Sequence, residues 1–139
     1  MRRATIGKHN FGVTIGIVTG MIANILILQM GMMIYPPPVD LDPNDMEAMT
    51  EMIAVMPLGQ LTFTYVGHLI QSGLGSIAGC LSNRQTAGRT GMLVGGVTAM
   101  FCMLNLLTVP HPSWFWTELP LTMGLGVGIG RWLQQPSEV

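Results

Sequence analysis

The chain has 139 residues, of which 49% are hydrophobic and only 9% are charged, whereas soluble domains are about 25% charged. Its mean hydropathy is +0.49 and its net charge is -1. This composition predicts a single membrane domain over residues 1–139, with the lipid bilayer as its main surroundings. It gives no indication of a nucleic-acid partner.

Four apolar stretches follow one another along the chain, at about 11–34, 57–81, 90–109 and 113–133. Each is long enough to cross a bilayer core, which takes about 20 residues of helix. The first is longer than the apolar part of a signal peptide, which has about 7–15 residues. We therefore predict an all-α protein, a bundle of four transmembrane helices.

The charges indicate the direction in which the chain crosses. All six Lys and Arg residues lie before the first stretch, between the second and third, or at the end of the fourth, and six of the seven acids lie at the opposite ends of the stretches. Glu138 is the exception. Because basic residues favour the cytoplasmic side, both termini are predicted to be cytoplasmic.

The first outer loop contains a further predicted helix at about 43–56. Asp42 is expected to cap it, and Pro43 suits its first position. Its apolar face consists of Met46, Met49, Ile53 and Met56. A copper site is the alternative for its methionines, Met46, Met49, Met52 and Met56. Three of them share one face with Ile53, which favours an amphipathic helix lying on the membrane surface or on a partner.

Small residues recur at four-residue spacing on all four predicted transmembrane helices, which places them on single helix faces. The pairs are Gly16 and Gly20, Gly75 and Gly79, Gly91 and Gly95, and, on the fourth helix, both Gly124 and Gly128 and Gly126 and Gly130. Such faces let helices approach closely, because lipid supplies no hydrophobic drive for helix association. The pattern predicts a compact bundle that also packs against itself or a larger membrane complex.

His68 is the one ionisable residue expected near the middle of the membrane, at about the depth of Asn24. We expect it to bond Asn24 or Gln71 as an interhelical hydrogen-bonding group. Because intramembrane ionisable groups are costly, a proton relay remains an alternative. A haem or chlorophyll ligand is a further alternative, although a second axial haem ligand is not evident at that depth.

A second cluster is predicted near the outer edge, where Asn105 and Glu118 flank a turn that contains His111. Glu118 falls in the first turn of the fourth helix, where the helix dipole favours a carboxylate. Capping is the favoured role, and a cation or solute site is the alternative. The interface anchors are expected to be Trp114, Trp116 and Trp132.

No pattern indicates an enzyme, a metal site or a resident cofactor. The two cysteines, Cys80 and Cys102, are expected at different depths, which argues against a disulfide, and both are interpreted as small packing residues. The alternating glycines from Gly124 to Gly130 follow no strand and so do not form a nucleotide-binding motif.

Several motifs occur together between about residues 16 and 132. They are Gly16-x-x-x-Gly20 with Asn24, Pro36-Pro37-Pro38 before an acidic loop, His68 before a Gly-rich half-helix, Gly95-Gly96 with Asn105, and Pro110-His111-Pro112-Ser113-Trp114-Phe115 with Glu118. In this combination the chain resembles a family of uncharacterised small bacterial membrane proteins with four helices. The resemblance implies a multi-pass protein of the bacterial inner membrane, and it implies no function.

The predicted function is that of a small non-enzymatic membrane protein, an accessory or structural subunit that forms a homo-oligomer or joins a larger membrane complex. One alternative is a small oligomeric transporter or proton-coupled carrier. Another is a haem- or chlorophyll-binding subunit of an electron-transfer or light-harvesting assembly, with His68 as the ligand.

Overall fold

The computed structural model describes residues 2–36 and 45–135, and side chains from residue 11 onward in these ranges except those of Met46 and Met49. Within these ranges the secondary structure is entirely helical, which confirms the all-α prediction. The elements are α1 (Arg2–Ile34), α2 (Met46–Val55), α3 (Leu58–Ser82), the short 3-10 helix η1 (Arg84–Thr86), α4 (Ala87–Thr108), the 3-10 helix η2 (Ser113–Thr117) and α5 (Glu118–Leu133).

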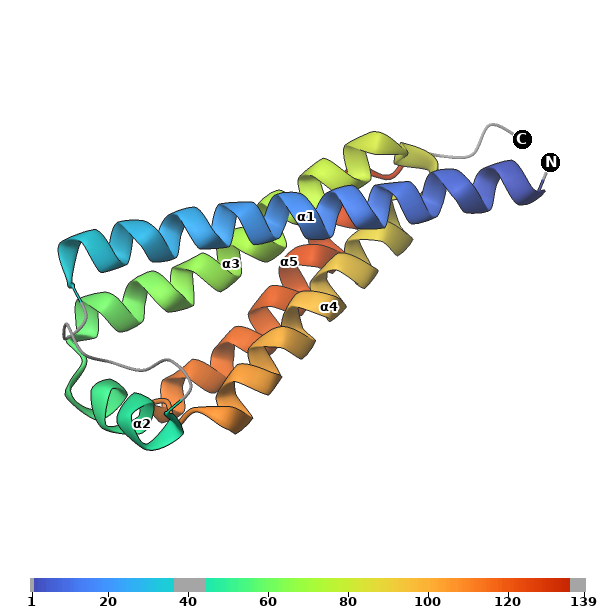
Figure 1. Ribbon diagram of the computed structural model, residues 1–139. Helices are drawn as coiled ribbons and strands as arrows, with labels where there is room; N and C mark the ends of the chain where they lie inside the picture. Colours follow the sequence, from blue (N-terminus) through green and yellow to red (C-terminus); the bar gives the residue numbers. More distant parts are fainter. Residues whose placement is uncertain (1, 37–44, 136–139) are drawn as a thin grey trace.

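The four long helices form an elongated bundle, and α2 closes one end of it (Figure 1). Helix α1 packs mainly on α3, α4 packs mainly on α5, and α3 contacts both α4 and α5. The start of α1 and the end of α5 lie toward the end of the bundle opposite α2 (Figure 1). Helix α3 is therefore the element that joins the two helix pairs.

Two helix starts differ from the sequence prediction. Helix α1 begins at Arg2 rather than at about residue 11, because no proline precedes residue 36 and a helix does not stop where its apolar stretch stops. Helix α2 begins at Met46, and its N-cap is Asp45, whose carboxylate accepts hydrogen bonds from the amides of Glu47 and Ala48 at 3.0 and 3.1 Å. The expected cap at residues 42 and 43 lies outside the described residues, as do the side chains of Met46 and Met49.

The fourth predicted helix is divided in the structure into η2 and α5. Pro120 lacks the amide hydrogen that would bond the carbonyl of Trp116 in an α-helix, so regular α-helical bonding cannot extend back through this turn. The preceding residues bond in the 3-10 pattern instead, with the amide of Phe115 donating to the carbonyl of Pro112 at 2.9 Å. A 3-10 helix rises about 2.0 Å per residue, so η2 carries the chain roughly 10 Å into the bundle before α5 begins.

The α1–α3 interface is a line of close backbone contacts at glycines. A Cβ atom on Gly16 would lie 2.7 Å from the carbonyl oxygen of Gly75, and one on Gly79 would lie 2.7 Å from that of Gly12. Gly20 meets the backbone of Gln71 in the same way. No larger residue fits these positions without separating the helices, as the sequence pattern predicts.

Helix α5 carries two different stripes of small residues. The buried stripe consists of Glu118, Thr122, Gly126 and Gly130, and all four are buried. A Cβ on Gly126 would lie 2.7 Å from the Cα of Gly95, and Gly91 also meets the backbone of Gly126 and Gly130. This stripe forms the α4–α5 interface, in which Gly91 and Gly95 pack as predicted.

The open stripe consists of Pro120, Gly124 and Gly128. A Cβ added to Gly124 or Gly128 would meet no atom within 4 Å, and both glycines are exposed. The structure thus corrects the prediction that these two glycines pack inside the bundle. Because the glycines of α5 alternate, two stripes lie about 200° apart around the helix, and the spacing does not indicate which stripe faces α4.

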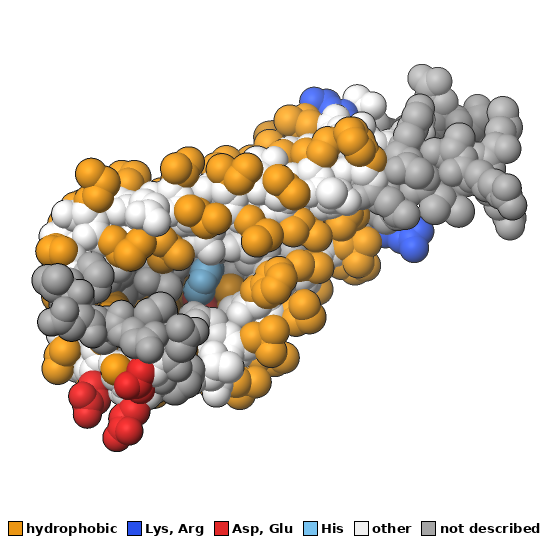
Figure 2. Space-filling model, in the orientation of Figure 1, with side chains coloured by type: hydrophobic (Ala, Val, Ile, Leu, Met, Phe, Trp, Pro, Cys, Tyr) orange, Lys and Arg blue, Asp and Glu red, His pale blue; other side chains and the backbone are white. Residues whose placement is uncertain are grey.

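The surface of the bundle is apolar along its length, and the charges gather at its ends (Figure 2). The acids of α2 lie at one end, and Arg84, Arg89 and Arg131 are exposed toward the other. Two helical segments of the described chain, Phe11–Ile34 and Arg84–Thr108, are long and apolar enough to cross a membrane. These features indicate association with a membrane.

Candidate functional site

Three polar side chains from three helices meet inside the bundle. They are His68 on α3, Cys102 on α4 and Glu118 at the start of α5, and together we call them the polar centre. The Nδ1 atom of His68 lies 2.8 Å from Oε2 of Glu118, a hydrogen-bonding distance. One potential ligand atom of each residue lies within 4.8 Å of the others.

The polar centre is almost completely shielded from solvent. Glu118 has no exposed surface, Cys102 is 1% exposed, and the side chain of His68 is 12% exposed. One carboxylate oxygen of Glu118, Oε1, has no hydrogen-bond partner. Burying a carboxylate oxygen without a hydrogen-bond partner costs folding free energy. Because nearly all buried polar atoms in proteins are hydrogen-bonded, an unpaired one points to a role beyond packing.

The local structure fixes the position of Glu118. The η2 helix brings the chain inward, and the hydroxyl of Thr122 then donates to the carbonyl oxygen of Glu118 at 2.8 Å. One turn further, the hydroxyl of Ser72 on α3 donates to the carbonyl oxygen of Thr122 at 2.6 Å. The bond from Ser72 joins α3 to α5 directly beside the polar centre.

A hydrophobic cluster covers the polar centre on the side of α2. Its buried members are Leu61, Leu106 and Phe115, and Ile53 and Met56 pack against them from the α2 segment. Leu61 lies two turns before His68, Leu106 one turn after Cys102, and Phe115 one turn before Glu118. In each case the direction is toward α2. The cluster therefore separates the polar centre from the α2 end.

A small pocket opens beside the polar centre between α1, α3 and α4. Its volume is about 180 Å³, and it is lined by Met21, Asn24, Ile25, His68, Gln71 and Phe101. The side-chain amide of Asn24 donates to Oε1 of Gln71 at 2.6 Å across the α1–α3 interface. Oδ1 of Asn24 is buried and has no hydrogen-bond partner.

The partners of His68 and Glu118 differ from those expected. Asn24 and Gln71 bond each other, and His68 bonds Glu118 instead of either of them. Glu118 lies in the first turn of α5, as predicted, but its carboxylate bonds His68 rather than a backbone amide. His111 stays in the turn, where its Nδ1 lies 2.8 Å from the carbonyl oxygen of Val109.

Asn105 is not part of the polar centre. Its backbone carbonyl accepts from the amide of Val109 at 3.0 Å, and among the described residues its side chain has no hydrogen bond to Glu118 or His111. The three tryptophans, Trp114, Trp116 and Trp132, are all exposed. Exposed rings suit interface anchors, and that role stays a prediction.

Sequence reasoning missed Cys102 as a member of the site. Both cysteines are free and buried, so the expected absence of a disulfide between them agrees with the structure. Cys102 lies on the same face of α4 as Gly95 and Thr98, and all three are buried. The spacing of these residues predicts that they share a face. It does not predict the contact between Cys102 and Glu118, because that contact depends on the depth at which α5 begins.

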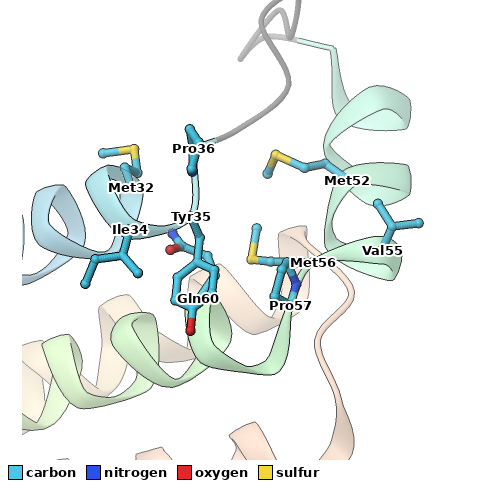
Figure 3. A pocket seen from close by; sticks show the side chains of 9 residues that line it. All are labelled: Met32, Ile34, Tyr35, Pro36, Met52, Val55, Met56, Pro57 and Gln60. Atoms are coloured by element: carbon cyan, nitrogen blue, oxygen red, sulfur yellow. The ribbon is translucent and has the colours of Figure 1, made fainter.

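A larger pocket lies at the α2 end, with a volume of about 430 Å³ and mainly apolar walls (Figure 3). Its lining residues are Met32, Ile34, Tyr35, Pro36, Met52, Val55, Met56, Pro57 and Gln60. The side chains of Met52 and Met56 therefore contribute to an apolar cavity between α1, α2 and α3. This placement suits the packing interpretation of these methionines.

No protein-family model, curated protein or solved structure matches the chain. The resemblance to a family of small bacterial membrane proteins therefore stays a prediction.

Proposed function

We propose that the chain is a small, non-enzymatic, multi-pass protein of the bacterial inner membrane, in which α1, α3, α4 and α5 all cross the bilayer and the open stripe of α5 binds a second copy of the chain. Two lines of evidence support the four crossings. Large apolar side chains are exposed on all four helices, including Leu26, Leu74, Met100 and Leu125. The exposed charges lie at the two ends of the bundle, which project from the bilayer into water when the four helices cross it (Figure 2).

The open stripe is the observation that carries the proposed association. It borders a groove of about 420 Å³ lined by Pro120, Leu121, Gly124, Leu125, Gly128 and Ile129. No charged side chain lines the groove, and a Cβ added to either of its two glycines would meet no atom within 4 Å. In lipid, such a surface lets another helix approach to backbone contact.

A second copy is the occupant that fits the groove best. A two-fold axis beside α5 would place the same glycines and the same Leu and Ile side chains of both chains against one another, so that one surface is its own partner. The buried stripe of the same helix provides an internal precedent, because there glycines already hold two helices in backbone contact. An accessory role in a larger complex would use the same surface for a different helix.

The association is tested by native mass spectrometry of the protein released from lipid nanodiscs. We expect a dimer for the wild type and a monomer for the Gly124→Leu/Gly128→Leu variant, since leucine would fill the groove. Gly73→Leu is the matched control, because Gly73 on α3 also has nothing within 4 Å but lies outside the groove. A monomeric wild type, or a double variant that still forms the dimer, would refute association through the open stripe.

The four crossings are tested separately by labelling single cysteines with a reagent that cannot cross the membrane. Glu47 on α2 and Gln85 on η1 are both exposed. In intact cells we expect Glu47→Cys to be labelled from outside and Gln85→Cys to be protected. Equal labelling of the two, or labelling of Gln85→Cys alone, would rule out the proposed topology.

The other two functions stay predictions. A proton-coupled carrier would depend on the His68–Glu118 pair. A haem- or chlorophyll-binding subunit would need room beside His68, and the adjacent pocket of about 180 Å³ is smaller than the roughly 300–1,000 Å³ of ordinary ligand sites. The size of this pocket therefore does not favour a haem or chlorophyll beside His68.

A further inference from the structure

The polar centre unites the three kinds of side chain that bind zinc in proteins: an imidazole, a thiol and a carboxylate. We propose that it is a site for one zinc ion, bound by a ring nitrogen of His68, Sγ of Cys102 and a carboxylate oxygen of Glu118. This inference goes beyond the proposed function and does not depend on association through α5.

The spacing of the three residues suits a tetrahedral ion. Zinc bonds of about 2.0–2.3 Å place neighbouring ligand atoms roughly 3.3–3.6 Å apart in a tetrahedron. The three candidate ligand atoms already lie within 4.8 Å of one another, and Nδ1 and Oε2 lie 2.8 Å apart. The separations in the structure therefore differ from those that zinc requires by no more than about 1.5 Å.

The charges also favour a divalent ion. A zinc ion with one thiolate and one carboxylate has no net charge, which suits a site without exposed surface. Without the ion, Oε2 of the buried Glu118 carboxylate lies at hydrogen-bonding distance from the imidazole, and Oε1 has no hydrogen-bond partner. The thiolate is the metal-binding form of cysteine, so binding releases the thiol proton of Cys102 while the imidazole binds through its unprotonated nitrogen.

The types of ligand discriminate among metals. Magnesium and calcium take oxygen ligands, and a thiol does not suit them. Copper(I) prefers sulfur, and only one of the three ligands here contains it. Zinc accepts nitrogen, sulfur and oxygen ligands alike, and three protein ligands leave a fourth position for water or another small ligand.

The surrounding structure supplies rigidity and a route of entry. The Ser72–Thr122 bond and the glycine contacts of the buried stripe hold α3, α4 and α5 in place around the polar centre. The imidazole of His68 lines the small pocket between α1, α3 and α4. An ion can therefore reach the site by way of the one member that is partly exposed.

The test uses the whole chain, purified in detergent without a polyhistidine tag and stripped with a chelator. Zinc binding is measured by titration and elemental analysis, and Co²⁺ serves as the spectroscopic probe. We expect one metal ion per chain and, with Co²⁺, a thiolate-to-cobalt charge-transfer band. Cys102→Ser should abolish this band and weaken zinc binding by more than about tenfold, since even a change outside the ligand set costs about 10–100-fold.

Cys80→Ser is the matched control. Cys80 is equally buried, but its thiol donates to the carbonyl oxygen of Ala87 at 3.2 Å and lies outside the polar centre. This variant should keep both the band and the wild-type affinity. The proposal is overturned if the folded wild type binds no stoichiometric zinc or forms no thiolate band with Co²⁺, or if Cys102→Ser binds as tightly as the wild type. The wild-type measurements decide the matter even if a variant fails to fold.

Discussion

The two stripes of α5 have similar residues and opposite environments. A Cβ on Gly126 or Gly130 of the buried stripe would clash with the backbone of α4, whereas a Cβ on Gly124 or Gly128 of the open stripe would meet no atom within 4 Å. The buried stripe also includes Glu118 and Thr122 and so joins the glycine interface to the polar centre. Glycine at four-residue spacing thus indicates a surface that allows close helix packing. Whether a helix of the same chain packs on that surface depends on where the neighbouring helices lie.

The largest effect is expected where a side chain would enter the α4–α5 interface. Gly126→Leu must push the backbones of Gly91 and Gly95 away. Overpacking costs about 1–3 kcal/mol when side chains can move, and here backbone must move, so we expect a loss of about 3 kcal/mol or more in unfolding free energy. Reversible unfolding with a denaturing detergent in mixed micelles measures it.

Gly124→Leu is the partner variant on the open stripe. As an exposed substitution without neighbours, it should change the stability of the single chain by no more than about 0.5 kcal/mol. Equal losses in the two variants would show that the stripes are not distinct in solution. A smaller loss at Gly126 than at Gly124 would reverse the assignment of the interface.

The next effect tests the polar end of the buried stripe. His68→Leu, measured with chelator present, leaves Glu118 buried without its partner. Interhelical hydrogen bonds in membranes contribute about 0.6–1.7 kcal/mol, and breaking a buried ion pair costs about 3–5 kcal/mol in soluble proteins. We expect an intermediate loss of about 2 kcal/mol in unfolding free energy.

The His68→Leu/Glu118→Leu variant sharpens this measurement. Replacing both members by apolar residues removes the unpaired carboxylate, so we expect the double variant to be more stable than His68→Leu alone. If the losses of the two single variants simply add in the double variant, the two side chains are not coupled. In that case the hydrogen bond does not contribute to holding α5 against α3.

The smallest expected effect concerns the hydrogen bond in the middle of the buried stripe. Ser72→Ala removes the donor to the carbonyl oxygen of Thr122 and should cost about 0.6 kcal/mol. Ser76→Ala is the control, one turn further along α3, because the hydroxyl of Ser76 is buried and has no partner. Its removal should be neutral or slightly stabilising, and a cost at Ser76 equal to that at Ser72 would contradict the role given to the Ser72–Thr122 bond.

Much of the fold was predictable because local patterns determine it. The apolar stretches, the prolines after Ile34 and the Ser82–Asn83 break indicated where helices end, and α3 and α4 lie within a few residues of the predicted ranges. On α1 and α3 the four-residue spacing occurs on one face only, at Gly16 and Gly20 and at Gly75 and Gly79, so it indicated the interface without knowledge of the partner. The separation of acidic and basic residues was likewise readable, because it depends only on their order along the chain.

The sequence by itself therefore determined the helical class, the positions of the breaks, the ends at which charges gather and the presence of close-packing faces. Only the tertiary structure decided which stripe of α5 faces α4 and which residues form the polar centre. The physical reason lies in η2 and Pro120, which set the depth and rotation of α5. Relative to a continuous α-helix, a 3-10 segment of five residues shifts α5 by about 2.5 Å along its axis and turns it by about 100°. No periodicity within a single helix records a change of that kind.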